Sequence, residues 1–239
     1  MAAEWLSQGF ISHESDDVSD QYFNMPGGTT TANVISTHYG SDPAKVHEIV
    51  VIGAHMDSTS RSAATNAPGA VDNGSGTIGA LLLGEAIRKA NFSRTVQVVA
   101  FSGEEQGIYG SAHYVAQAAK KGDTIVGALI MDMISYSNRY FGVTIEGTTS
   151  APIQALMKQV EGNLNLYSPA LTVNLADFSF GSDHVPFQRA GIPCVLAIEQ
   201  DDTNYFGYHQ TTDVVANSNA SQAMAILRGF GGALYDLAN

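Results

Sequence analysis

Four short runs of almost unbroken apolar residues constrain the fold of this chain more than any other feature. They cover His47–Ala54, Thr95–Phe101, Ile125–Met133 and Pro193–Ile198. A strand with water on one face alternates apolar and polar residues, so unbroken runs of this length indicate strands that are buried on both faces. Such strands belong to a parallel or mixed sheet that helices cover on each side.

Helical patterns separate these runs. Helices are expected over Thr77–Ala90, Ser111–Lys120, Pro152–Val160 and about Ser218–Leu237. In the first helix Ile78, Leu81, Leu82 and Ile87 share one face, which predicts that this face packs on the sheet. Buried strands that alternate with helices predict an α/β fold with a twisted, mostly parallel sheet and helices on both faces.

The N-terminal region is expected to add a hairpin to this sheet. Tyr22–Met25 and Thr31–His38 lie on either side of the breaker Pro26-Gly27-Gly28, a pattern typical of two strands joined by a turn. No stretch is long enough to be a domain linker. The 239 residues are therefore expected to form a single domain, with residues 1–30 as an N-terminal segment packed onto it.

Charge and composition exclude several classes of function. The 11 Lys and Arg residues against 23 Asp and Glu give a net charge of −12, so the chain lacks the basic footprint that nucleic-acid binding requires. No run approaches the roughly 18 apolar residues of a membrane span, so no membrane partner is expected. The single cysteine, Cys194, excludes an internal disulfide and a zinc site built on several cysteines.

Polar side chains gather where the predicted strands end. His55 and Asp57 follow the first run, Glu104 and Glu105 follow the second, and Asp132 lies near the end of the third. Asp72 precedes the first helix and His209 follows the last run. Ligands of open α/β sheets bind at the carboxyl ends of the strands. Carboxylates packed together repel one another unless a cation joins them, and histidine with carboxylate suits zinc. Two imidazoles and three carboxylates suffice for two ions if one carboxylate bridges them.

Each of these residues taken alone has a plainer structural explanation. His55 could be a core histidine, Asp72 could cap the following helix, and Glu104 with Glu105 could be a solvated pair. Their joint position at strand ends favours a metal site. The stretch Gly74–Gly79 fits G-x-G-x-x-G, but a polar loop rather than a strand precedes it, which argues against dinucleotide binding.

The order of these motifs resembles a known family. The segments are Gly53–Ser58, Pro68–Gly76, Phe101–Ser111, Met131–Met133 and Tyr208–Asp213. Together they closely resemble the co-catalytic di-zinc aminopeptidases, the bacterial leucyl aminopeptidase-like zinc exopeptidases, from about Thr31 to the C-terminus. The resemblance implies a single-domain three-layer sandwich and two Zn²⁺ ions per chain.

The resemblance also implies a role for each motif residue. Asp72 would bridge the two ions, with His55 and Asp132 completing one site and Glu105 and His209 the other. Glu104 would be the general acid and base, and Tyr208 would stabilise the oxyanion. Asp57 would orient His55, and the Asp72–Asn73 peptide would be cis. The side chains expected to line an apolar pocket for the substrate are Met133, Tyr205, Phe206, Phe178 and Phe180.

The activity implied is hydrolysis of the first peptide bond of peptides with a free N-terminus, with a preference for apolar N-terminal residues. A dipeptidase or carboxypeptidase on the same fold is a second hypothesis; it requires a cation for the substrate carboxylate, and Arg61, Arg139 and Arg189 lie nearest the motifs in the sequence. A single-zinc glutaminyl cyclase and a non-catalytic binding module are further alternatives. The resemblance also leads us to expect a monomer that is secreted or periplasmic, although no leader is visible at Met1–Phe10.

Overall fold

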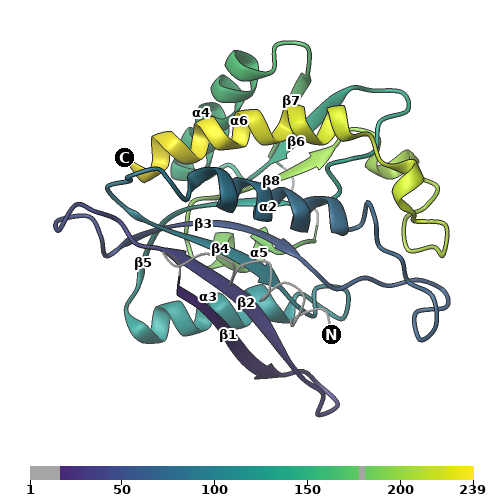
Figure 1. The fold of residues 1–239 in the computed structure, drawn as a ribbon, viewed down its shortest axis with the longest axis horizontal. Coiled ribbons are helices and arrows are strands. Elements are labelled where there is room, and N and C mark those ends of the chain that lie inside the picture. The colour runs from purple at the N-terminus through teal and green to yellow at the C-terminus, as the bar shows by residue number, and fades with distance from the viewer. Residues whose placement is uncertain (1–16, 178–180) are drawn as a thin grey trace.

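Eight strands form one mixed sheet in the computed structural model, which describes residues 17–177 and 181–239 (Figure 1). The strands are β1 (Asp17–Asn24), β2 (Thr30–His38), β3 (Glu48–His55), β4 (Thr95–Phe101), β5 (Thr124–Met131), β6 (Gly142–Glu146), β7 (Thr172–Ala176) and β8 (Cys194–Glu199). Their order across the sheet is β1-β2-β4-β3-β5-β8-β6-β7. The central strands β4, β3, β5 and β8 run parallel, so their carboxyl ends meet at one edge of the sheet.

The four apolar runs are the four central strands, as the sequence predicts. Each observed strand begins and ends within two residues of its run, and Val50, Val51 and Ile52 of β3 are fully buried. The expected N-terminal hairpin is also present, as β1 paired antiparallel with β2. The α/β prediction is therefore confirmed.

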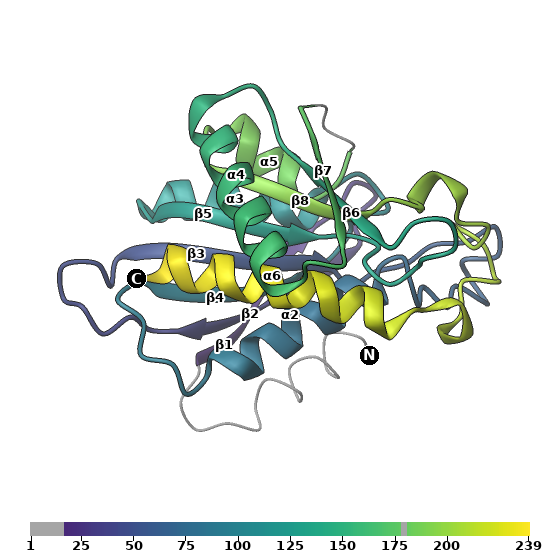
Figure 2. The ribbon, with the colours of Figure 1, turned by 90° about the horizontal axis from the view of Figure 1, so that it is seen from above.

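Helices cover both faces of the sheet (Figure 2). They are α2 (Gly74–Ile87), α3 (Tyr109–Lys121), α4 (Ala151–Tyr167), α5 (His184–Arg189) and α6 (Ala220–Ala238), with short 3-10 turns at Asp202–Asn204 and Val215–Asn217. One core cluster joins the sheet to α2, α4 and α6, and a second joins it to α3 and α5. The three-layer arrangement follows from these two separate cores.

The prediction of which face of α2 packs on the sheet is wrong in part. Ile78 and Leu82 are 55% and 49% exposed, and the helix instead buries a face that includes Gly79, Ala80 and Leu83. The reason is close approach, because a Cβ on Gly79 would lie 3.0 Å from the side chains of Ile134 and Leu227. Small residues let this helix approach the neighbouring side chains closely. Hydrophobic periodicity does not detect such small residues as part of a buried face.

Three elements are absent from the sequence prediction. Strands β6 and β7 are only five residues long and partly exposed, and α5 is a single short helix of six residues, so none carries a strong periodic signal. Helix α4 continues to Tyr167, well beyond the predicted end at Val160. None of the helices in the described part of the chain has the length and apolar character needed to cross a membrane.

Candidate metal centre

The predicted ligand residues converge at the carboxyl edge of the central strands. His55 ends β3, Glu105 follows β4, Asp132 follows β5, Asp72 precedes α2, and His209 lies beyond β8. These five side chains line one cleft of about 230 Å³ together with Glu104, Met133 and Tyr208. Residues that lie far apart in the sequence therefore meet because parallel strands deliver their carboxyl ends to one place.

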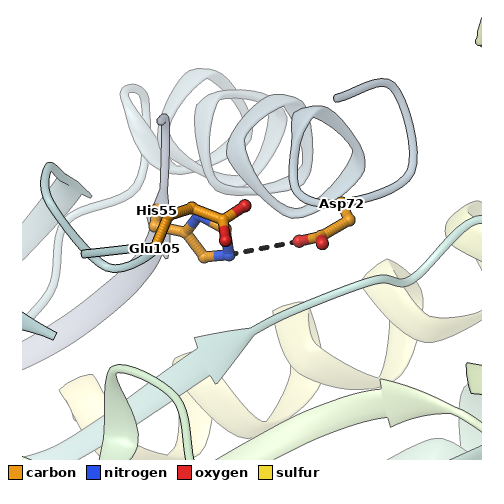
Figure 3. A group of neighbouring side chains, drawn as sticks. All are labelled: His55, Asp72 and Glu105. Atoms are coloured by element: carbon orange, nitrogen blue, oxygen red, sulfur yellow. Dashed lines mark ion pairs between the residues drawn. The ribbon is translucent and has the colours of Figure 1, made fainter. Parts of the chain in front are cut away.

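Two groups of histidine and carboxylate share Asp72. His55 Nε2 lies 3.5 Å from Asp72 Oδ1 and 3.4 Å from Asp132 Oδ1. His209 Nε2 lies 3.3 Å from the other oxygen of Asp72, Oδ2, and 3.0 Å from Glu105 Oε2. His55, Asp72 and Glu105 each offer a ligand atom within 4.8 Å of the others, and Figure 3 shows their polar ends turned toward one another. Each oxygen of Asp72 thus faces a different histidine, and the group His55, Asp72 and Glu105 could hold a metal ion.

A buried carboxylate fixes the loop that carries Asp72. Asp213 accepts hydrogen bonds from the backbone N–H groups of Val71, at 2.9 Å, and Asp72, at 3.0 Å. The Asp72–Asn73 peptide is cis, as the resemblance implies. Asn73 then caps α2 by accepting from Gly76 N, and its amide donates to the carbonyl of Met131 at the end of β5. The loop that carries Asp72 is thus held by contacts of its backbone to Asp213 and of Asn73 to α2 and β5.

Asp57 supports the centre differently from the role that the resemblance implies. Its carboxylate accepts the backbone N–H groups of Glu104 and Glu105, at 3.2 and 3.1 Å. His55 Nδ1 lies 3.0 Å from the backbone carbonyl of Asp57 but 3.8 Å from its carboxylate. The backbone carbonyl is therefore the oxygen of Asp57 within hydrogen-bond distance of the imidazole, and it orients the ring.

Electrostatics in the centre favour a bound cation. Burial raises the pKa of Glu104 to about 9 and, together with the repulsion of Asp72, that of Glu105 to about 7. Burial opposes protonation of His55, but the surrounding acids, Asp132 first and then Asp183 and Glu104, together outweigh it and raise the pKa of the imidazole. Among the described residues, the buried Glu105 Oε1 has no hydrogen-bond donor, and the buried Asp132 Oδ1 has no hydrogen bond beyond its 3.4 Å contact with His55 Nε2. Protons collect here because negative charge is crowded, and a divalent ion would neutralise the same charge.

A comparison with protein-family models identifies the family of the chain. The model described as "Peptidase family M28" matches residues 33–231. The chain belongs to peptidase family M28. Among curated family relatives, a probable leucine aminopeptidase of Arthroderma otae is 30% identical over 210 residues, covering 82% of this chain and 56% of the relative. Leucine aminopeptidase 1 of Neurospora crassa is 29% identical over 233 residues, covering 89% of this chain and 56% of its own length. The chain spans about half the length of these relatives.

Solved structures share the M28 fold of this chain. LapB from Legionella pneumophila aligns with a TM-score of 0.83 at 19% identity, covering 99% of this chain and 65% of LapB. BSAP, a zinc aminopeptidase from Bacillus subtilis, aligns with a TM-score of 0.72 at 24% identity, covering 87% of this chain and 50% of BSAP. A glutaminyl cyclase from Bacteroides thetaiotaomicron aligns with a TM-score of 0.79 at 15% identity, covering 98% of this chain and 88% of the cyclase. The fold is therefore common to zinc aminopeptidases and to a cyclase.

Of the residues expected to line a substrate pocket in this M28 chain, two line a pocket, one does not, and two are not described. Met133 and Tyr205 line a side pocket of about 130 Å³ that adjoins the metal cleft. Phe206 is 61% exposed and packs on Tyr136 and Tyr205 instead. Phe178 and Phe180 lie outside the described residues.

Sequence reasoning missed three supporting residues. Asp213 holds the Asp72 loop, and Ser182 donates from its hydroxyl to Asp132 Oδ2 at 2.8 Å. Asp202 lines the side pocket. Asp213 belongs to the segment Tyr208–Asp213 that carries the resemblance, and this was the available signal for it.

The metal-free protein should lose stability as the pH rises from 7 to 9. Glu104, with a folded pKa of about 9 against an ordinary 4.5, keeps a proton in the folded chain that the unfolded chain has already released. The raised pKa of His55 acts in the same direction, because its stabilising charge is lost as the pH climbs. Folding therefore takes up protons in this range, and stability falls with pH. Thermal melting of chelator-treated protein at pH 7, 8 and 9 measures the slope; a rising melting temperature would contradict it.

Proposed function

We propose that this chain is a zinc-dependent aminopeptidase that carries two Zn²⁺ ions. The observation that carries the proposal is the pair of histidine–carboxylate groups that share the two oxygens of Asp72. Both groups contain one imidazole and carboxylate oxygens, the mixed ligand set that suits zinc. The family membership and the relatives named as leucine aminopeptidases support the same conclusion.

The proposed ligands divide into two sets. His55 and Asp132 would hold one ion, His209 and Glu105 the other, and Asp72 would bridge them. Zinc ions bound in this way lower the pKa of a bound water and polarise a carbonyl group. The buried Glu105 Oε1, which has no hydrogen-bond donor among the described residues, would gain a partner in the ion.

Glu104 would move the proton in the reaction. It lines the metal cleft without joining either group of ligands, and the carboxylate of Asp57 fixes its backbone N–H. A carboxyl with a raised pKa is a stronger base, and it can return the proton to the leaving amine as a general acid. Bound cations would lower the pKa of Glu104 from its metal-free value of about 9 toward the working pH.

Tyr208 would donate a hydrogen bond to the carbonyl oxygen of the substrate. Its ring stacks on His209 with centroids 3.9 Å apart, which holds the phenol at the edge of the cleft. Burial and the neighbouring acids raise its pKa, so the phenol stays protonated and remains a donor at neutral pH. A donor aimed at a developing negative charge stabilises the transition state more than the ground state.

The acidic cleft would select the substrate end. A free N-terminal amine is cationic or metal-binding, and the cleft presents four acids to it: Asp72, Glu104, Glu105 and Asp132. The side pocket beside it is walled by Met133, Ile198 and Tyr205, which favours apolar parts of the first residue. We therefore propose N-terminal cleavage with acceptance of apolar first residues.

One observation favours very short peptides as a second candidate class of substrate. A neighbouring groove of about 520 Å³ shares Gly107, Ile108 and Gly181 with the metal cleft and contains Arg189. The guanidinium of Arg189 is a ready partner for a peptide's terminal carboxylate. A dipeptidase or carboxypeptidase would depend on that contact, whereas an aminopeptidase would not.

Removal of metal is the direct test of the proposal. Dialysis against a chelator should abolish hydrolysis of leucyl 4-nitroanilide, and Zn²⁺ should restore it at a stoichiometry of two ions per chain. N-acetyl-leucyl 4-nitroanilide is the matched control and should not be cleaved. Activity that survives chelation would overturn the zinc mechanism. Cleavage of acetylated dipeptides together with loss of activity on C-amidated dipeptides would assign the enzyme to the carboxyl end instead.

A further inference from the structure

The side pocket next to the metal cleft contains one acid among apolar walls. Its lining residues are Met133, Ile198, Asp202, Thr203, Tyr205 and Tyr208. Met133 and Tyr208 also line the metal cleft, so the two spaces adjoin each other at these two side chains. A substrate whose terminal amine lies at the metal centre can therefore place its first side chain beside Asp202.

The neighbouring acids differ from Asp202 because they are fully buried and hold the loop at residues 136–140, whereas the backbone N–H groups that Asp202 accepts belong to its own turn, at Asp202 and Thr203. Asp201 is buried, and its Oδ2 accepts the backbone N–H groups of Asn138, Arg139 and Tyr140 at 2.7, 2.7 and 3.0 Å. Glu199 is buried and accepts the backbone N–H of Tyr136. Asp202 opens the 3-10 turn Asp202–Asn204 and is only half-buried. It is thus the acid of this segment that a ligand can reach.

Asp202 also lacks a cationic partner in the protein. No lysine, arginine or histidine within residues 17–177 and 181–239 forms an ion pair with it. Partial burial, with a smaller contribution from Asp201, raises its pKa. A carboxylate in this setting gains more from a cation than a fully solvated one does, because water screens the contact less.

We propose that Asp202 makes the side pocket select N-terminal residues with an apolar stem and a cationic tip, lysine above all. This inference rests on the proposed aminopeptidase function and concerns the pocket beside the same centre. The methylenes of lysine would lie against Met133, Ile198 and Tyr205, as long basic side chains do on apolar surface, while the ammonium would reach Asp202. Leucine and methionine would still fill the apolar walls but would leave the carboxylate unpaired.

Norleucine isolates the charge, because its side chain is the lysine stem without the ammonium. The experiment measures kcat/KM for lysyl, norleucyl and leucyl 4-nitroanilides with the zinc-loaded protein. We expect the wild-type protein to favour the lysyl over the norleucyl substrate by about tenfold, the size of one hydrogen bond to a charged group. Asp202→Asn should remove that ratio, and added salt should reduce it in the wild-type protein.

Asp123→Asn is the matched control. It removes the same charge from an exposed site just before β5, at the opposite end of that strand from Asp132, and it should leave the ratio unchanged. A wild-type preference for norleucine, or an equal change of ratio in both variants, overturns the assignment of Asp202 while leucyl turnover continues. Absence of turnover on all three substrates, with two zinc ions bound, would instead refute the proposed aminopeptidase function.

Discussion

Glu104→Gln should abolish nearly all turnover while leaving the metal centre loaded. Glutamine matches the shape of glutamate but cannot accept a proton, and a positioned general base contributes about 10²–10⁴-fold to a rate. We therefore expect kcat on leucyl 4-nitroanilide to fall by about 10³-fold, the middle of that range. Zinc content should stay at two ions per chain, because Glu104 belongs to neither group of proposed ligands.

The same variant carries a second readout that a general structural defect would not produce. Burial raises the pKa of Glu104 to about 9, and glutamine has no proton to lose, so the metal-free variant should melt with a shallower dependence on pH between 7 and 9. Asp123→Asn serves as control for the loss of one charge. Near-normal turnover in Glu104→Gln would exclude Glu104 as the base, and loss of zinc would assign it to the ligands.

The parts of the fold that sequence could predict are those with a strong, local signal. Thr95–Phe101 is rich in β-branched and apolar residues with Gln97 as its one strongly polar interruption, and its boundaries are those of β4. The buried face of α2 is the opposite case: Gly79 and Gly84 contribute no hydrophobicity, yet they let Ile134, Leu227 and Val98 approach the helix closely. Periodicity weighs side chains by apolar character, so it points to Ile78 and Leu82, which lie in solvent.

The candidate site divides in the same way. The residues proposed as ligands can be recognised in the sequence because they are acids and histidines at the ends of buried strands, as His55 and Asp132 are. The roles of the supporting residues cannot be recognised in this way, because they depend on loops whose course only the tertiary structure defines. Asp213 reaches the backbone of Asp72 across 141 positions of sequence, and the carbonyl rather than the carboxylate of Asp57 meets His55. The convergence of these side chains was thus predictable, whereas the contacts that fix them were not.

Asp72→Asn should empty both halves of the proposed zinc centre. Each oxygen of Asp72 faces a different histidine, Oδ1 toward His55 and Oδ2 toward His209. Asparagine preserves the volume, and the bonds from Asp213 go to backbone N–H groups, so the loop keeps its supports. It nevertheless removes the shared negative charge and turns one ligand oxygen into a donor that faces a cation. Turnover should fall at least as far as in Glu104→Gln, by about 10³-fold or more.

The metal count separates a bridging role from an ordinary ligand role. His209→Ala removes a side chain that contacts only Glu105 and Asp72 Oδ2 among the proposed ligands, so this variant should keep one ion of the two. Asp72→Asn should bind neither tightly, and added zinc should no longer raise its melting temperature, because only binding to the folded state stabilises it. Zinc per chain after gel filtration, read beside melting with and without zinc, gives the answer. Two tightly held ions in Asp72→Asn would mean that each half of the centre is complete on its own, and the shared carboxylate would then be a neighbour of the ions and not their bridge.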